Sequence, residues 1–390
     1  MICWRHVEWR LVGRVRPAVA MLAVCAVGAA VLDGAPAPAK GDGSVVRTTR
    51  AASDAIPGVF EAAAGTSARD VWAVGHTSVG SGQTLIAHWN GAGWSTVPSP
   101  SPGSFASLAG VAATATTDAW AVGLANASPV GSASPSQQAL ILRWDGVRWT
   151  QVAVPALGPL ADLRAVAATS AGNAWAVGSA GSRTLILHWD GSTWTQMPGP
   201  AGELEGVAAS SPSNAWAVGS TGKFRTLILH WNGRVWSRVP SPSRTPEGLA
   251  DFLNSVAIGP GNAAWAVGTI SCGCGPGTSL IERWNGRSWR VVPSPTGGGP
   301  DLASVISIGA RDAWAAGATG SGPGPEKTAI LHWNGQTWKR AASPSPDPSA
   351  SLAALTLVSP GDIWAVGGGS DRKRTRFTTV VLHWNGRMWR

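Results

Sequence analysis

The chain has 390 residues, among them 50 Gly, 28 Pro and 23 Trp but no Tyr, and only 13% are charged. This composition favours many short strands joined by turns, and it excludes bundles of long, charge-laced helices. The formal net charge is +9. The basic residues are not concentrated on one predicted element, so the charge does not indicate a nucleic-acid-binding protein.

Residues 1–39 are predicted to be an export signal. Four arginines precede an uncharged run at 18–32, and small residues and prolines follow. The run of 15 residues is shorter than the roughly 20 of a membrane-spanning helix, which favours a cleaved signal peptide. The alternative is an uncleaved signal anchor, which would be the only attachment to a membrane. We therefore expect a secreted or cell-surface protein.

Two of the four cysteines lie in the signal segment, which leaves Cys272 and Cys274 in a Gly-rich loop. In an oxidising compartment this pair can form one small loop disulfide. A zinc site would need further ligands that the neighbouring sequence does not supply. No metal is predicted here.

An internal repeat organises the rest of the chain. The string WAVG, or a close relative, recurs seven times, and each copy is followed by an apolar run that ends in Trp, then Asn-Gly or Asp-Gly, then a third Trp. Seven copies of this unit use 21 of the 23 Trp. The first Trp of each unit is at 72, 120, 175, 216, 265, 314 and 364. Repeats of this length are typical of propellers and solenoids.

Each unit is predicted to form four short strands, named a to d, which in the fourth unit lie near 206–209, 215–218, 227–231 and 236–239. The a-to-b turn ends in Asp or Asn, which we expect to bond its own turn backbone. Asn232-Gly233 predicts a two-residue type I′ turn between strands c and d, which pairs Trp231 with Arg234. The Trp of strands c and d would then be diagonal neighbours that pack within the blade.

The predicted fold is an all-β, seven-bladed β-propeller of four-stranded antiparallel blades, preceded by the N-terminal signal segment. The propeller is assigned to residues 58–390. Residues 40–57 are expected to be a linker. Because the chain stops at Trp389-Arg390, where other units continue strand d, we expect residues 44–50 to supply or extend the outer strand of the last blade.

The succession AWAVG, LILHWNG and VPSP resembles kelch-type repeats, and it is also similar to the Asp-box turns of sialidase-like secreted propellers. The resemblance covers residues 58–390 and implies the propeller fold. It carries over no site residues. Propellers of these types include copper oxidases with Tyr ligands and sialidases with a Tyr nucleophile, and both activities are excluded by the absence of Tyr.

In a four-stranded meander, the b-to-c loops and the d-to-a segments lie on one face. They vary strongly between units, whereas the turns of the other face are uniform. Variable loops on a rigid scaffold favour a binding site. The candidate ligand-binding residues in these loops are Phe224, Arg372, Lys373, Arg374, Arg376 and Phe377.

Five units place His directly before the second Trp, and two place Arg there. Neighbouring blades hold these positions too far apart for one metal ion, so we expect hydrogen-bonded side chains between blades. No nucleophile beside a base and no convergent acids are recognised, so no catalytic residue and no cofactor is predicted.

We favour a noncatalytic extracellular binding or interaction module, monomeric, with a glycan or a protein as ligand. Two alternatives stay open. One is a secreted hydrolase or lyase with an unrecognised carboxylate site, and the other is a structural surface protein.

Overall fold

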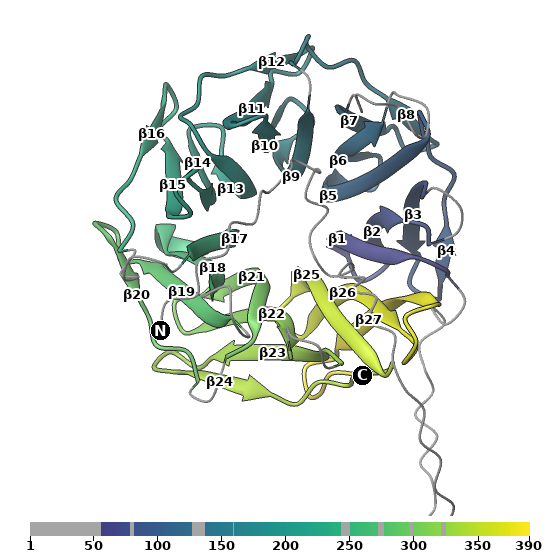
Figure 1. The fold of residues 1–390 in the computed structure, drawn as a ribbon, viewed down its shortest axis with the longest axis vertical. Coiled ribbons are helices and arrows are strands. Elements are labelled where there is room, and N and C mark those ends of the chain that lie inside the picture. The colour runs from purple at the N-terminus through teal and green to yellow at the C-terminus, as the bar shows by residue number, and fades with distance from the viewer. Residues whose placement is uncertain are drawn as a thin grey trace, which may run out of the picture. The chain divides into compact units, whose positions relative to one another are not determined.

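Seven antiparallel blades form a ring, with the first strand of each blade innermost and the last outermost (Figure 1). The computed structural model describes residues 56–78, 82–126, 137–158, 160–242, 250–271, 277–295, 299–320 and 325–390. Six blades have four strands, and the seventh has three and an isolated bridge. The predicted propeller is confirmed. The signal segment and Cys272 and Cys274 lie outside the described residues.

The strands follow the repeats in chain order. Blades 1 to 3 contain β1 (Val59–Ser67), β2 (Asp70–His76), β3 (Thr84–Trp89) and β4 (Trp94–Thr96), then β5 (Phe105–Ala115), β6 (Asp118–Asn126), β7 (Gln137–Trp144) and β8 (Trp149–Gln151), then β9 (Ala161–Ser170), β10 (Asn173–Ala180), β11 (Arg183–Trp189) and β12 (Trp194–Gln196). Blades 4 and 5 contain β13 (Glu203–Ser211), β14 (Asn214–Ser220), β15 (Thr226–Trp231) and β16 (Trp236–Arg238), then β17 (Ala250–Ile258), the 3-10 turn η1 (Pro260–Asn262), β18 (Ala264–Ser271), β19 (Thr278–Trp284) and β20 (Trp289–Val291). Blades 6 and 7 contain β21 (Asp301–Gly309), β22 (Asp312–Thr319), β23 (Lys327–Trp333) and β24 (Trp338–Ala341), then β25 (Ser349–Ser359), β26 (Asp362–Ser370) and β27 (Phe377–Trp384). In the described part of the chain, no helix is long and apolar enough to cross a membrane.

The glycine that ends WAVG is required by the packing of the first two strands. In blade 4, Gly219 lies opposite Leu204, next to a register shift between Leu204 and Gly206. A Cβ at Gly219 would collide with the carbonyl oxygen of Glu203. Only glycine allows the inner strand to approach β14 this closely at the bulge.

The connection between strands c and d differs from the prediction. Trp231 pairs directly with Trp236, and Leu229 pairs with Arg238, so the predicted pairing of Trp231 with Arg234 was wrong. The loop has four residues rather than two. The Asn232 side chain accepts hydrogen bonds from the backbone N–H groups of residues 234 and 235, both at 3.0 Å. These bonds fix the wider loop, and only Gly233 takes a positive φ, 91°.

A triad of Trp side chains joins each blade to the next. Trp216 of β14 lies 5.0 Å from Trp284 and 5.2 Å, edge-on, from Trp289, measured between ring centroids, and both partners belong to blade 5. Edge-to-face contacts of buried indoles combine a large apolar area with favourable quadrupole geometry. The other triads are Trp72/Trp144/Trp149, Trp120/Trp189/Trp194, Trp175/Trp231/Trp236, Trp265/Trp333/Trp338, Trp314/Trp384/Trp389 and Trp364/Trp89/Trp94. The Trp therefore pack between blades, not only within them.

The ring closes between blades 7 and 1 by the same contacts as elsewhere. Trp364 of β26 lies 5.0 Å from Trp89 and 5.5 Å from Trp94 of blade 1. The carbonyl of Ile56 accepts bonds from the backbone N–H and the hydroxyl of Thr379, each at 3.4 Å. In blades 1, 3, 5 and 6, the carbonyl of a proline that precedes the next blade accepts the equivalent hydroxyl bond. Residue 56 thus occupies the position of an ordinary connecting segment.

The outer position of the last blade is filled by the end of the chain. His383 and Arg390 exchange two backbone hydrogen bonds, of 2.9 and 3.1 Å, beside the bridge between Trp384 and Trp389. The predicted contribution of residues 44–50 lies outside the described residues and stays a prediction.

If the triad between blades 7 and 1 stabilises the ring as much as the triad between blades 4 and 5, Trp364→Ala will destabilise the protein as much as Trp216→Ala. Each should lower the free energy of unfolding by about 3–5 kcal/mol, because each leaves a cavity between two blades. Urea unfolding followed by far-UV circular dichroism measures both. A loss below about 1 kcal/mol for Trp364→Ala alone would show that the ring is not closed in this way.

Candidate functional site on the loop face

The face that carries the a-to-b and c-to-d turns, named here the turn face, repeats the same polar contacts. In blade 4, His230 packs at a tilt against Trp216 with ring centroids 4.3 Å apart and shares a 2.8 Å hydrogen bond with Asn214. Asn214 donates to the hydroxyl of Ser210 at 2.7 Å, so its partners are side chains rather than the turn backbone that we predicted. The equivalent pairs are His88–Asp70, His188–Asn173, His332–Asp312 and His383–Asp362. These His bond within their own blade, so their predicted contact between blades was wrong.

The two arginines at the His position do connect blades. Arg143 donates to Asp118 of its own blade at 3.0 Å and to the carbonyl of Ala171 in blade 3 at 3.5 Å. Arg283 donates to the carbonyl of Ala310 in blade 6 at 3.2 Å. The polar groups of the turn face thus serve the scaffold.

The opposite face, named here the loop face, carries the b-to-c loops and the starts of the inner strands. Here the repeats differ in charge. Directly after the buried Leu or Phe of the inner strand, blades 2, 6 and 7 have Ala and blade 5 has Asn, whereas blades 1, 3 and 4 have Glu61, Arg164 and Glu205. Such departures are residues that the repeat pattern itself does not dictate.

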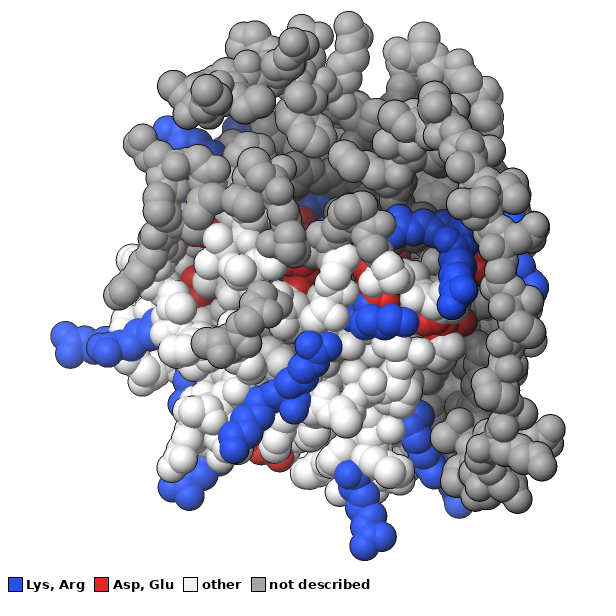
Figure 2. Space-filling view, turned by 60° about the horizontal axis from the view of Figure 1, so that its bottom comes forward, with Lys and Arg blue, Asp and Glu red and all other residues white. Residues whose placement is uncertain are grey.

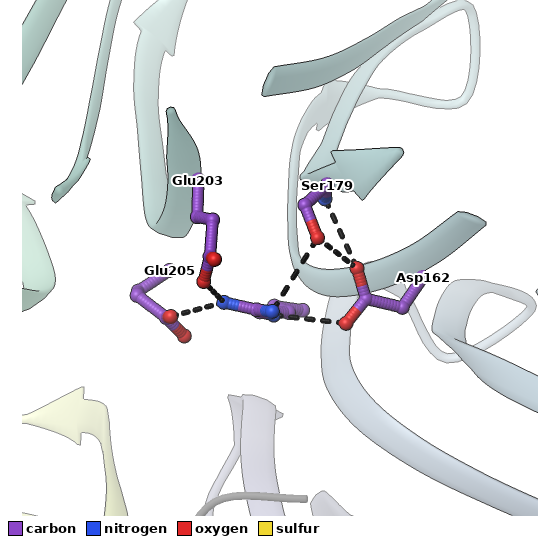
Figure 3. A network of polar contacts seen from close by, with 5 residues as sticks. Asp162, Ser179, Glu203 and Glu205 are labelled. Atoms are coloured by element: carbon purple, nitrogen blue, oxygen red, sulfur yellow. Dashed lines mark hydrogen bonds and ion pairs between the residues drawn. The ribbon is translucent and has the colours of Figure 1, made fainter. Parts of the chain in front are cut away.

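Arg164 is the centre of a network between blades 3 and 4 (Figure 3). Its Nε donates to Asp162 at 3.0 Å, and its Nη1 donates to Glu203 at 3.0 Å and to Glu205. Asp162 also accepts bonds from the backbone N–H and the hydroxyl of Ser179, at 3.1 and 2.7 Å. The inner strands β9 and β13 and the second strand β10 therefore meet at one guanidinium.

The network has one positive and three negative groups. Burial alone would lower the pKa of Arg164, but Glu205, Asp162 and Glu203 together raise it above its ordinary value. The side chains of Arg164 and Asp162 are 12% and 7% exposed, whereas Glu203 and Glu205 are 36% and 20% exposed. The two glutamates are thus the members that a ligand can reach, and they present net negative charge.

A second departure lies between blades 4 and 5. Glu282 of β19 is completely buried at a position where five other blades have Leu. The pKa of its carboxyl is raised to about 7: burial raises it most, bonds from the Ser241 hydroxyl at 2.9 and 3.1 Å lower it, and the charge of Asp251 raises it. Because no part of Glu282 reaches solvent, it cannot act on an external ligand.

The predicted aromatic ligand-binding residues occupy different blades. Phe224, at the end of the b-to-c loop of blade 4, packs edge-on against Phe252 with ring centroids 6.0 Å apart and is 49% exposed. Phe377 begins β27 in blade 7 and is half-buried. They stand at equivalent positions of non-adjacent blades, so the structure does not combine them in one aromatic patch.

The predicted basic residues form one exposed loop in blade 7. Asp371 holds this loop by accepting bonds from the backbone N–H and the hydroxyl of Thr375, at 2.8 and 2.7 Å, and these bonds lower its pKa. Arg374 takes a positive φ of 55° and lies near Glu326 of blade 6, where it opposes the rise in the pKa of Glu326 that burial causes. The exposed members are Arg372, Lys373, Arg374 and Arg376.

Arg164, Glu203, Glu205 and Glu282 were missed in the sequence. An alignment of the repeats would have shown Glu282 where five other blades have Leu and one has Ala, and it would have shown charge at the position of Arg164 and Glu205, which three other blades fill with Ala. Within the described ranges, no group of three or more His, Cys, Asp or Glu is arranged to hold a metal ion.

Arg164→Met is expected to lower the free energy of unfolding by about 3–5 kcal/mol, because it leaves three carboxylates without their common partner. The matched control is Arg183→Met, which removes an exposed arginine of the same blade and should change stability by less than about 0.5 kcal/mol. Denaturant unfolding at neutral pH measures both. Equal effects of the two substitutions would contradict the structural role of Arg164.

Glu282 should make the protein less stable as the pH rises from about 4.5 to about 7. Its folded-state pKa, about 7, exceeds the ordinary value of 4.5, so the folded state binds more protons than the unfolded state in this window. The effect is on the order of 3 kcal/mol. Glu282→Leu, the residue of the other repeats, should remove this slope and raise the melting temperature most at pH 8. Melting curves of both proteins that stay parallel from pH 5 to 8 would refute this assignment.

No family model matches the sequence, and neither does any curated protein. Several solved propellers share the fold. YCF48 bound to D1 peptide has a TM-score of 0.55 and 14% identity, over 83% of this chain and 92% of that one. A PL25 ulvan lyase, a polysaccharide lyase, has a TM-score of 0.56 and 8% identity over 86% and 96%. The GH74 xyloglucanase from Xanthomonas campestris has a TM-score of 0.55 and 14% identity, over 87% of this chain and 55% of that one. The chain is thus similar in fold to both binding proteins and glycan-active enzymes.

Proposed function

We propose that this protein is a noncatalytic, extracytoplasmic binding module whose loop face holds a segment of a partner protein. One observation carries the proposal: on this face, charged residues that depart from the repeat have both signs. The acidic side is Glu203 and Glu205 of blade 4, and the basic side is the loop 371–376 of blade 7. Complementary charges of both signs give a protein partner orientation and specificity.

A protein partner fits this surface better than a glycan. Sugar rings commonly stack on exposed aromatic side chains, but no Trp in the described ranges is exposed, because every one packs in a blade or between blades. Phe224 is the only large aromatic side chain that is substantially exposed there. The loop face therefore offers charge rather than a stacking platform.

Catalysis is the second candidate, since carboxylates do converge on the loop face. Asp162, Glu203 and Glu205 each pair with Arg164 through one carboxylate oxygen, and Asp162 is buried. A hydrolase or lyase would need such a group to be in reach of substrate and available for proton transfer. The structural neighbours support either use of the fold, and the one bound to a peptide supports the binding function.

Peptide display against the purified protein tests the proposal. We expect selected peptides to carry Lys or Arg, and Glu203→Gln with Glu205→Gln to weaken their binding roughly tenfold, since each lost charge pair contributes about 0.5–1 kcal/mol. The matched control, Glu326→Gln, removes an acid from the same face in blade 6 and should change affinity less than about twofold.

The alternatives give distinct outcomes. Saturable binding on a glycan array that the two glutamate substitutions weaken, with no selected peptide, would replace the protein partner of the loop face with a glycan. Release of unsaturated or reducing sugar ends from a polysaccharide would make the protein an enzyme and overturn the proposal.

A further inference from the structure

A band of basic side chains runs along the turn face and outer edge of blades 4 to 7, on surfaces that the loop-face function does not use. We name it the basic crescent. All of its members are exposed: Arg234, Arg238, Arg287, Arg290, Arg311, Lys339, Arg340, Arg387 and Arg390. Figure 2, with the bottom of Figure 1 turned forward, shows Lys and Arg side chains projecting from a largely uncharged surface.

The fold does not require the charges on the outer strands, because blades 1 to 3 form the same strands without them. The two residues after the Trp of strand d are Ser95 and Thr96 in β4, and Thr followed by Gln in both β8 and β12. In β16, β20 and β24 the same two positions hold Arg238, Arg290, and Lys339 with Arg340. On the outer strands the difference is confined to one side of the ring; in the turns, blades 1 and 2 also carry exposed arginines, Arg69 and Arg148, and Arg148 lies 4.0 Å from Asp145.

Carboxylates do not neutralise the crescent. In the described parts of blades 4 to 7, the only Asp and Glu at the turns or outer strands are Asp312 and Asp362. Each bonds the His of its own blade, at 2.9 and 2.7 Å. Charged side chains at sheet edges also prevent edge-to-edge pairing, but β4, β8 and β12 are equally short outer strands and lack them. Edge protection therefore does not account for the asymmetry.

We infer that the basic crescent binds an acidic polysaccharide. The charges follow a curved edge across four blades, which a flexible linear polyanion can follow and a flat membrane cannot. Single-stranded nucleic acid binds through stacking on aromatic side chains as well as phosphate contacts, and the Trp beneath the crescent are packed between blades. The ligand expected is thus a chain of sugars with repeated carboxylate or sulfate groups.

The test measures binding of heparin, polygalacturonate and neutral dextran to the purified protein at low salt. A crescent variant takes residues from blades 1 to 3: Arg238→Gln, Arg290→Thr, Lys339→Thr and Arg340→Gln. A loop variant loses the same charge elsewhere: Arg372→Gln, Lys373→Gln, Arg374→Gln and Arg376→Gln. We expect the acidic polymers but not dextran to bind. The crescent variant should bind roughly tenfold or more weakly, and the loop variant within about twofold of the parent, because only the former loses contact charges.

Several results would overturn the inference. One is that the protein binds neither acidic polymer, and another is that the two variants lose the same binding affinity. A third is that the protein prefers vesicles with anionic lipids, or DNA, over both polysaccharides. Thermal melts confirm that each variant is folded. Since the loop variant and the glutamate variants of the loop face report on the proposed partner site, failure of one proposal is distinguishable from failure of the other.

Discussion

The contact on which the structure depends is the Trp triad at each blade boundary. A single blade is a small, twisted sheet with two faces to cover, and it cannot bury both by itself. The Trp of each second strand extends to the next blade, where it meets two Trp held directly opposite each other across strands c and d. Each blade therefore completes its neighbour, and the set is complete only when the ring closes.

This arrangement divides the molecule into surfaces with different constraints. On the turn face, His230 and its equivalents pack against the Trp of the second strand and bond the Asp or Asn of the adjoining turn, so the same residues recur. On the loop face the triads impose no such requirement. Departures such as Arg164 and Glu205 appear there, and they are where a partner-specific function can be acquired without loss of the ring.

Much of the fold could be predicted from the sequence, because the Trp-rich unit recurs seven times and each unit contains short apolar runs separated by turn residues. The error in register has a physical cause: Asn-Gly suits a two-residue turn, but the Asn232 side chain instead organises a four-residue loop. The contact of Trp216 with blade 5 could not be foreseen, since strand pairing alone says nothing of neighbouring sheets.

The candidate site was predictable only in part. The face and the basic loop follow from loop variation, whereas Arg164 and its carboxylates are brought together from strands of two blades. Their separation in sequence, from 162 to 205, conceals the network. The same holds for the basic crescent, whose members are two or three per repeat and come together only when the blades are side by side.

The most direct test of the closed ring is native-state hydrogen exchange. If the triads hold every boundary alike, the amides of Val366 in β26 and Val74 in β2, on either side of the closure, should exchange as slowly as those of Val218 in β14 and Val267 in β18. Their protection should agree within about tenfold. Exchange at Val366 and Val74 that is faster by about a hundredfold or more, with the internal blades still protected, would show a ring that opens at its closure and would contradict the account.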